Sequence, residues 1–292
     1  RRPPRSTPKP SSAASDVYKR QNQFTDNPEV TTLAGSGSSG STNATGTSAK
    51  FNGPVGISTD GTNLYVADYN NHTIRKIVMA TGVVSTFAGS PGSSGSTDAT
   101  GTSARFKNPQ GITTDGTNLY VAEMDNHKIR KIVIATGVVT TFAGSGSQGS
   151  TDATGTSATF KHPWGITTDG TNLYVADSSN NKIRKIVIST GEVTTFASGF
   201  NVPKGIVIVG ANLYVVDSNN HRISKIVISS GAVSTLAGSG NATFADGTGT
   251  SASFNKPYQM VSDGTNLYVT DSGNNKIRKI VTVSYTHLTL PT

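Results

Sequence analysis

The chain has 292 residues, of which 34% are hydrophobic and 14% are charged, and none is cysteine. This length suffices to bury a full hydrophobic core, whereas the lack of cysteine excludes disulfides, thiolate metal sites and thiol catalysis. The 32 glycines, the many serines and threonines, and the lack of any apolar run near the ~18 residues that a membrane span needs predict a soluble, turn-rich β-protein with no membrane span.

The formal net charge is +8, but six of the basic residues lie within residues 1–21, against a single Asp. This segment has neither the apolar stretch of a signal peptide nor an amphipathic period. Both this segment and the last residues of the chain resemble peptides that are translated from sequencing-adapter DNA at the ends of a metagenomic read. We expect a non-native or disordered basic tail at 1–21, a folded domain at 22–283 and a non-native tail at 284–292. The alternative for the first segment is a genuine basic arm.

Residues 30–34, Val-Thr-Thr-Leu-Ala, are predicted to form a β-strand that has no partner nearby in the sequence. Five copies of one unit follow, and each contains four short strand patterns. The copies begin at Pro54, Pro109, Pro163, Pro203 and Pro257, with steps of 55, 54, 40 and 54 residues. Such a period is typical of propellers and solenoids. Four-stranded antiparallel meanders repeated around an axis are the blades of a β-propeller, so we predict an all-β propeller.

Tight turns are predicted at two places in each copy. Asp-Gly between the first and second strands is a strong hairpin signal, because both central turn positions favour positive φ. It occurs at Asp60, Asp115, Asp169 and Asp263, and the fourth copy has Val209-Gly210 instead. A glycine then separates the third and fourth strands, as at Gly82.

The longer steps contain inserts of roughly 14 residues, rich in Gly, Ser and Thr, between one fourth strand and the next first strand. We expect them to be loops on the same face as the turns after the second strands. The fourth copy has no insert before it, which predicts a notch beside Trp164 and Lys204.

The fifth copy stops after its third strand, at Ile280-Val281. The strand at 30–34 could complete that blade and close a five-bladed propeller. The alternative is an incomplete six-bladed parent.

The sequence of the third copy, PWGITTDGTNLYVADSSNNKIRKIVISTGEVTTFA, resembles the NHL-repeat family, and the resemblance extends over residues 29–283. It implies an NHL-type β-propeller. Relatives serve as protein-binding or RNA-binding modules and, in lyase- and lactonase-like members, as enzymes, so the fold alone does not give the function.

The turn after each second strand carries an acidic residue followed three positions later by Asn, as in Asp68-Tyr-Asn-Asn-His72. Repeated carboxylates and imidazoles could hold a divalent metal, as in lyase-type propellers. Because one set occurs per repeat, we interpret them instead as residues that cap their own turns. His162, outside this pattern, is interpreted as a loop residue.

The third strands carry Arg-Lys pairs, as at Arg184-Lys185, which predict a ring of positive charge. Such a ring could attract RNA or an acidic polysaccharide. Aspartates are interleaved with these bases, so we interpret the ring as a solvated stripe and do not expect nucleic-acid binding.

The best candidates for ligand binding are positions that differ among the repeats within an otherwise constant frame. One follows the first proline of each copy and the other follows the turn acid. The candidate binding residues are Trp164, Lys204, Tyr258, Gln110, Tyr69 and Met124. Aromatic rings and one lysine around a channel mouth suit a polar ligand or a peptide.

We therefore predict a non-catalytic binding or scaffold module that recognises a protein, peptide or glycan through its insert-loop face. The alternative is a metal-dependent enzyme similar to the lyase or lactonase propellers. We expect no catalytic residues, no metal and no cofactor, because the first strands offer mainly Gly, Ile, Ser and Thr to the axis. A monomeric bacterial protein in the extracellular space or periplasm is expected.

Recurring aromatic residues predict the core. One Phe per copy should be buried where the insert returns, and one Tyr should pack between blades. They are Phe51, Phe106, Phe160, Phe200 and Phe254, with Tyr65, Tyr120, Tyr174, Tyr214 and Tyr268.

Overall fold

The computed structural model describes residues 30–282, and a boundary between two compact units follows Leu33. All the strands described below belong to the unit that begins at Ala34. The tails expected at 1–21 and 284–292 lie outside the described residues. Within residues 30–282, no helix is long and apolar enough to cross a membrane.

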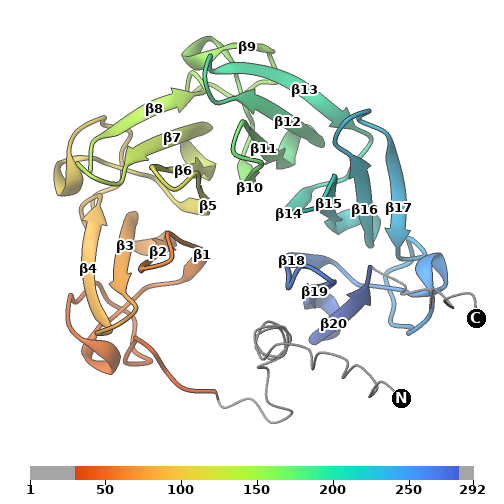
Figure 1. Cartoon of the computed structure of the whole chain (residues 1–292), viewed down its shortest axis with the longest axis horizontal. Coiled ribbons are helices and arrows are strands. Elements are labelled where there is room, and N and C mark those ends of the chain that lie inside the picture. Colours follow the sequence, from red (N-terminus) through yellow and green to blue (C-terminus); the bar gives the residue numbers. More distant parts are fainter. Residues whose placement is uncertain (1–29, 283–292) are drawn as a thin grey trace, which may run out of the picture. The chain divides into compact units, whose positions relative to one another are not determined.

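The unit from Ala34 is a β-propeller of five antiparallel blades, in which the strands of each blade follow chain order from the axis outward (Figure 1). The innermost strands are β1 (Pro54–Thr59), β5 (Pro109–Thr114), β10 (Pro163–Thr168), β14 (Pro203–Val209) and β18 (Pro257–Ser262). The second strands are β2 (Asn63–Asp68), β6 (Asn118–Glu123), β11 (Asn172–Asp177), β15 (Asn212–Asp217) and β19 (Asn266–Asp271). The third strands are β3 (Thr73–Val78), β7 (Lys128–Val133), β12 (Lys182–Val187), β16 (Arg222–Val227) and β20 (Lys276–Val281).

Blades 1 to 4 each have a fourth, outer strand. These strands are β4 (Val83–Ala88), β8 (Val139–Ala143), β13 (Glu192–Ser198) and β17 (Val233–Ala237). Blade 3 also carries the short strand β9 (Ala153–Thr154) outside β13, whereas blade 5 has three strands within the described residues. The predicted all-β propeller with five repeats is confirmed.

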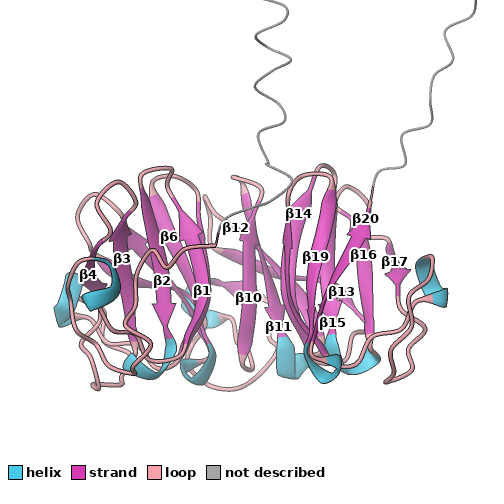
Figure 2. Cartoon of the chain, turned by 90° about the horizontal axis from the view of Figure 1, so that it is seen from below, coloured by secondary structure: helices cyan, strands magenta, loops and turns pink. Residues whose placement is uncertain are grey.

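Short 3-10 helices occur at two kinds of position. Turn helices link the second and third strands: η2 (Tyr69–Asn71), η4 (Met124–Asn126), η6 (Ser178–Asn180), η7 (Ser218–Asn220) and η9 (Ser272–Asn274). Insert helices lie in the loops before the blades: η1 (Gly46–Ser48), η3 (Gly101–Ser103), η5 (Gly155–Ser157) and η8 (Gly249–Ser251). In the side view the turn helices gather at one end of the blades, which we call the turn-helix face (Figure 2).

The Asp-Gly hairpins form as predicted. In blade 2, Oδ1 of Asp115 accepts hydrogen bonds from the backbone N–H groups of Thr117 (2.8 Å) and Asn118 (2.6 Å), and Oδ2 accepts one from the Tyr120 hydroxyl (3.0 Å). Gly116 has φ +88°, a conformation that favours glycine. Burial alone would raise the pKa of Asp115, but these hydrogen bonds outweigh it and hold the pKa below its ordinary value.

Replacing Asp115 with Asn is therefore expected to lower the free energy of unfolding at neutral pH and to change it little in strong acid. A carboxyl group whose folded pKa is depressed stabilises the fold above its unfolded pKa, here 3.8, and this stabilisation is lost as pH falls through the folded pKa. Urea unfolding of both proteins at a series of pH values measures the difference. Tyr120→Phe, which removes one donor, should show part of the same effect. A difference independent of pH would contradict the expectation.

The sequence left two alternatives open, and closure of the ring by residues 30–34 is not the one found in this structure. These residues form no strand, and within residues 30–282 β20 pairs only with β19. Successive inner strands contact each other from β1 to β18, but no broad contact joins β18 to β1.

The recurring aromatic residues pack as predicted at the inner junctions. Phe106, Phe160 and Phe254 are at most 1% exposed, and Tyr120 and Tyr174 are 1% exposed. The remaining members are Phe200 and Tyr214, both buried, Tyr65, fully buried, and Phe51 and Tyr268, which are only half-buried. Phe51 and Tyr268 belong to the two terminal blades, where the neighbouring blade is lacking within the described residues.

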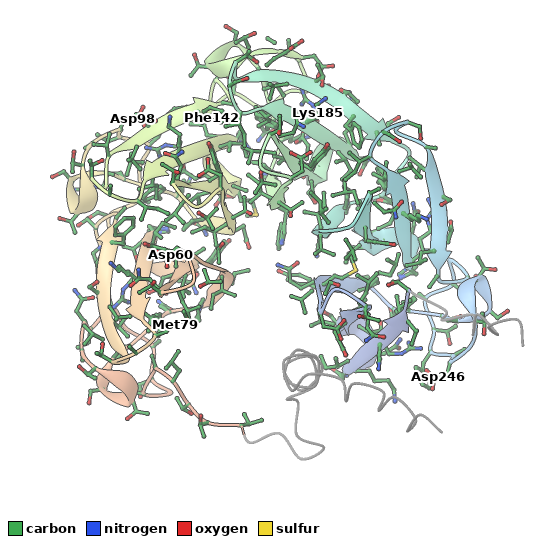
Figure 3. All side chains as sticks on the ribbon, viewed as in Figure 1. Asp60, Met79, Asp98, Phe142, Lys185 and Asp246 are labelled. Carbon is green, nitrogen blue, oxygen red and sulfur yellow. The ribbon has the colours of Figure 1, made fainter. Side chains whose placement is uncertain are left out.

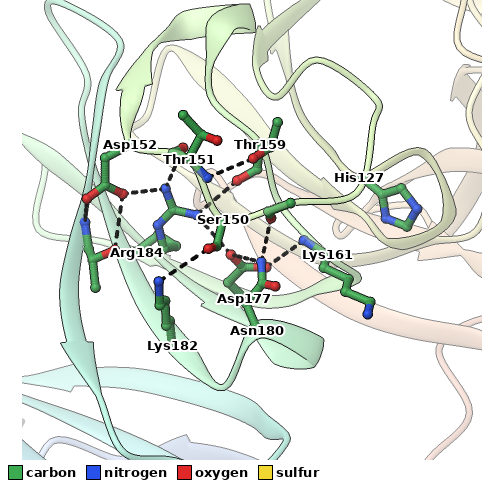
Figure 4. A network of polar contacts seen from close by, with 12 residues as sticks. His127, Ser150, Thr151, Asp152, Thr159, Lys161, Asp177, Asn180, Lys182 and Arg184 are labelled. Carbon is green, nitrogen blue, oxygen red and sulfur yellow. Dashed lines mark hydrogen bonds and ion pairs between the residues drawn. The ribbon is translucent and has the colours of Figure 1, made fainter.

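A buried arginine on the third strand fastens each insert to its blade, as Figure 4 shows for blade 3. The Nη1 group of Arg184 donates to Asp177 (2.9 Å) and to the Thr159 carbonyl (2.9 Å), while Nη2 donates to Asp152 (2.6 Å) and the Thr151 carbonyl (3.0 Å). Arg184 is fully buried, as are its equivalents Arg75 and Arg130. The expected solvated stripe of arginines is therefore wrong, because the insert folds over the strand and removes the guanidinium group from water.

The fourth copy has neither an insert nor this arginine. Ser224 stands at the arginine position, and Arg222 instead pairs with the turn acid Asp217 at 2.8 Å. Insert and arginine thus occur together, because the arginine is buried only where an insert covers it.

The inserts begin at the turn-helix face, as expected, and then run along the outer edge of the blades. In blade 3 the insert pairs with the outer strand, Thr154 opposite Glu192. The expected notch between Trp164 and Lys204 is therefore wrong. Because blade 4 has no insert, its outer edge is left uncovered, and Val233 on that edge is 45% exposed. The equivalent Val84, Val139 and Val193 are at most 2% exposed.

Candidate functional site at the mouth of the central channel

The candidate residues on the inner strands occupy a β-bulge that begins each strand. In blade 3, Pro163 pairs with Asp177 and Ile166 with Val175, and the register shifts between them, at Trp164 and Gly165. The same shift occurs in the other four blades. Bulges redirect side chains next to binding sites. Because Asp177 directly precedes a turn helix, the bulges lie toward the turn-helix face.

Three predicted residues from three different blades come together, and we call them the mouth cluster: Trp164, Lys204 and Tyr258. The ammonium nitrogen of Lys204 lies 5.0 Å from the centre of the Trp164 ring and 4.1 Å from that of Tyr258. The two rings meet edge to face, with 5.4 Å between their centres. Within residues 30–282 no carboxylate pairs with Lys204. Burial and, second, the charge of Lys256 lower the pKa of Lys204.

The other predicted residues lie on blades 1 and 2. The Gln110 side-chain amide donates to the Met124 sulfur at 3.7 Å, and Gln110 is only 3% exposed. Tyr69 is half-buried at the first position of η2. Burial and, second, the Tyr69 phenol raise the pKa of Tyr258. The structure thus places Gln110 with Met124 in one group and the mouth cluster in another, and Tyr69 belongs to neither group.

Several polar atoms around the mouth are buried without a hydrogen-bond partner. They include Nε1 of Trp164, Oε1 of Gln110 and Oγ of Ser218. Ser218 follows the turn acid of blade 4, at the position equivalent to Tyr69 and Met124. Sequence reasoning placed Ser218 among the variable positions but did not select it, because serine there gives no signal of its own. Unpaired buried donors and acceptors cost free energy unless a ligand or water pairs with them.

Behind the mouth, the inner strands of all five blades line an axial cavity of about 390 Å³. Its walls are mostly Gly, Ile, Val, Ser and Thr, together with Gln259 and Met260. Within the described residues 30–282, no three His, Asp or Glu side chains gather where they could hold a metal ion.

The repeated turn residues have structural partners. Asp177 accepts a hydrogen bond from the backbone N–H of Lys161 (2.8 Å) as well as from Asn180 and Arg184. The expectation that the turn acids cap their own turns is therefore wrong, because Asp177 makes no cap hydrogen bond to its turn and instead fixes the segment that enters the first strand. Burial raises the pKa of Asp177, against the effect of these donors.

The turn histidines join neighbouring blades. Nδ1 of His127 accepts a hydrogen bond from the backbone N–H of His162 (3.2 Å). Nδ1 of His72 likewise accepts a hydrogen bond from the backbone N–H of Asn108 (3.2 Å). His162 has φ +50° and lies directly before β10, so it is a loop residue, as interpreted from the sequence.

The fold and the axial site define a class of protein: a repeat β-propeller whose inner bulges present variable side chains at one channel mouth. The family model of the NHL repeat matches residues 51–77. NHL repeat-containing protein 2 of Bos taurus is 34% identical over 144 residues, which cover 46% of this chain and 20% of that protein. Protein SUPPRESSOR OF QUENCHING 1, chloroplastic, of Arabidopsis thaliana is 30% identical over 182 residues, 58% of this chain and 17% of that protein.

The chain thus carries an NHL repeat at residues 51–77 and is similar to NHL repeat-containing protein 2. It spans about a fifth of the length of these curated relatives. Among solved structures, a chain of the Nidogen/Laminin Complex has a TM-score of 0.59 at 18% identity, over 78% of this chain and 75% of that chain. An auxiliary nutrient binding protein from Bacteroides thetaiotaomicron has a TM-score of 0.51 at 18% identity, over 78% and 69%. These two structures share the fold.

Proposed function

We propose that this propeller is a non-catalytic binding module that recognises an acidic protein segment or peptide at the mouth of its channel. NHL propellers often serve as protein-interaction scaffolds, which supports a binding role in general terms. The observation that carries the specific proposal is the mouth cluster, where a lysine without a carboxylate partner lies between two aromatic rings.

The chemistry of the mouth favours a carboxylate. The Lys204 ammonium and the Trp164 indole N–H are donors, and a carboxylate oxygen accepts from both kinds of group. Charge-assisted hydrogen bonds of this type are stronger than neutral ones. The rings of Trp164 and Tyr258 offer apolar area for the adjoining side chain.

The test is binding to an array of peptides that carry Asp, Glu or a free C-terminal carboxylate, each printed beside its amide analogue. We expect Lys204→Met to weaken the best hit about 10-fold to 100-fold, the equivalent of the ~1.5–3 kcal/mol of a charge-assisted hydrogen bond. Trp164→Ala should weaken it as well. Affinity should also fall as pH rises through the lowered pKa of Lys204, because only the ammonium form attracts a carboxylate.

Lys185→Met is the matched control, because Lys185 lies on the third strand of blade 3 and away from the mouth (Figure 3). Equal binding of the amide analogues, or unchanged affinity after both mouth substitutions, would contradict the proposal. Selective binding to a glycan array, without binding to the peptides, would refute the proposed peptide ligand and indicate a carbohydrate ligand.

A further inference from the structure

The free edge of β20 forms one wall of a groove in blade 5. In blades 1 to 4 the third strand pairs with an outer strand, whereas within residues 30–282 β20 pairs only with β19. A groove of about 550 Å³ runs beside it. Its walls are the end of β17, the insert before blade 5 and β20 itself, with Asp246, Thr248, Phe254 and Arg278 among its lining residues. In blade 3 the outer strand β13 lies between the equivalent elements, β12 and the insert strand β9.

The insert side of this groove carries a carboxylate that binds the outer strand in other blades. In blade 3, Asp152 accepts hydrogen bonds from the backbone N–H (2.9 Å) and the hydroxyl (3.1 Å) of Thr195 on β13. Its equivalent Asp246 pairs with Arg278 at 2.8 Å and is 82% exposed, against 44% for Asp152. Asp246 lies at the outer rim of blade 5 (Figure 3). The groove thus presents a strand edge together with the acceptor for one particular threonine.

A segment of this chain has the sequence that the groove requires. The outer strands share Val-x-Thr followed by Phe or Leu and Ala, as in Glu192-Val-Thr-Thr-Phe-Ala197. Residues 29–34 are Glu-Val-Thr-Thr-Leu-Ala, which places Thr32 at the position of Thr195. Residues 30–34 form no strand, and Val30 is 93% exposed, whereas the equivalent Val193 is 1% exposed.

The arrangement favours a second copy of the chain as the source of this segment. Gly35 and Ser36 donate hydrogen bonds to the carbonyls of Gly46 (3.1 Å) and Ala49 (2.9 Å), which holds the end of the segment on the insert of blade 1. Blade 1 is not the neighbour of blade 5 here, because no broad contact joins β1 to β18. Gly144 and Gly35 hold equivalent positions, directly after an outer-strand sequence. A Cβ atom added at Gly144 would contact both His127 of its own blade and Phe160 of the next blade, whereas one added at Gly35 would contact only Phe51. The two end blades therefore carry matching halves of one blade junction.

We propose that the groove beside β20 binds residues 30–34 of a second copy as a fourth strand, so that two copies exchange strands. Strand addition provides main-chain hydrogen bonds for affinity and side-chain pockets for specificity. Exchange of an identical element between copies is a low-cost route to dimers. The association would also cover apolar residues of the end blades, where Ile57 is 59% and Ile277 is 71% exposed. This proposal is independent of the mouth cluster.

Sedimentation of the full chain over a wide concentration range tests the proposal. We expect reversible self-association that Val30→Asp abolishes. Thr32→Val should weaken it about 10-fold to 100-fold, the effect of one lost hydrogen bond to a charged group. Asp246→Ala removes the acceptor of both the hydroxyl and the backbone N–H of Thr32, so it should weaken association at least as much, and the double variant should be no weaker than Asp246→Ala alone. Thr31→Ala is the matched control and should have little effect. A synthetic peptide of residues 29–36 should dissociate the dimer, and the same peptide with Asp in place of Val30 should not.

Three results would overturn the proposal. One is a monomer at every concentration, and another is self-association that persists in Val30→Asp. The third is a monomer in which the amides of residues 30–34 are protected from hydrogen exchange, since the chain would then fill its own groove. Circular dichroism and thermal unfolding of each variant show that a loss of association is not a loss of folding.

Discussion

Replacing Arg184 with Met is expected to lower the free energy of unfolding by about 3–5 kcal/mol, the usual cost of removing one partner of a buried ion pair. Asp177 is fully buried, and the substitution would leave its carboxylate without its cation. The Asp152 carboxylate and the carbonyls of Thr151 and Thr159 would lose their shared donor at the same time. Equilibrium unfolding in urea, followed by circular dichroism, measures the loss.

The adjacent residue supplies the matched control. Lys185→Met replaces a cation with Met one position along β12. Lys185 is half-buried and makes no side-chain hydrogen bond or ion pair within residues 30–282, so the change should alter the free energy of unfolding by no more than about 0.5 kcal/mol. A combined Asp177→Asn and Arg184→Met variant should be less destabilised than the sum of its single changes, because it leaves no fully buried charge without a partner, and Asp152 is 44% exposed. Similar stabilities for Arg184→Met and Lys185→Met would show that the insert holds itself in place without the arginine.

Replacing Phe160 with Ala is expected to cost about 3–5 kcal/mol. The Phe160 ring is fully buried in the core between blades 2 and 3, together with Tyr120, Ile166 and Leu173. The guanidinium carbon of Arg184 also lies 5.1 Å from the ring centre, so the substitution would leave a cavity and remove a cation–π contact. Thermal and urea unfolding, with the cavity checked by crystallography, give the comparison.

Phe51→Ala is the corresponding change at the terminal blade and should cost clearly less, because Phe51 is already half-buried. Equal losses at both positions would show that the inter-blade core contributes little and that the phenylalanine acts only within its own insert.

The repeat pattern was sufficient to predict the blades, because the same strand patterns, separated by glycine turns, recur in the same order from copy to copy. Asp-Gly turns set the hairpins locally, so their prediction needed no knowledge of the tertiary structure. The burial of Arg184 could not be predicted in this way. It depends on an insert 32 or 33 residues earlier folding back over the strand, and an Arg-Lys pair in isolation is typical of an exposed strand. The one signal present was that the copy without an insert also lacks the arginine, at Ser224.

Comparison of the repeats also predicted part of the candidate site. Variation at fixed repeat positions selected Trp164, Lys204 and Tyr258, since a position that differs among copies is not held by the common packing. The direct contact among these three residues depends on the bulge and on the distance between blades, and neither can be read from one repeat. Closure by residues 30–34 was one of two alternatives that came from strand counting, which ignores whether the end blades approach each other.

We call the arginine, the turn acid and the insert of a blade its clamp, and the separation of the clamp from the mouth has a consequence for how such a protein can change over time. The clamp holds each blade except blade 4 from the outside, whereas the side chain after the first proline contributes little to that hold. Mutations at the mouth can therefore accumulate without loss of folding, and a new ligand preference requires only one altered side chain per blade. A duplicated blade would bring its own clamp with it and add one more variable position to the ring. The repeat thus separates the residues under selection for folding from those free to acquire new specificity.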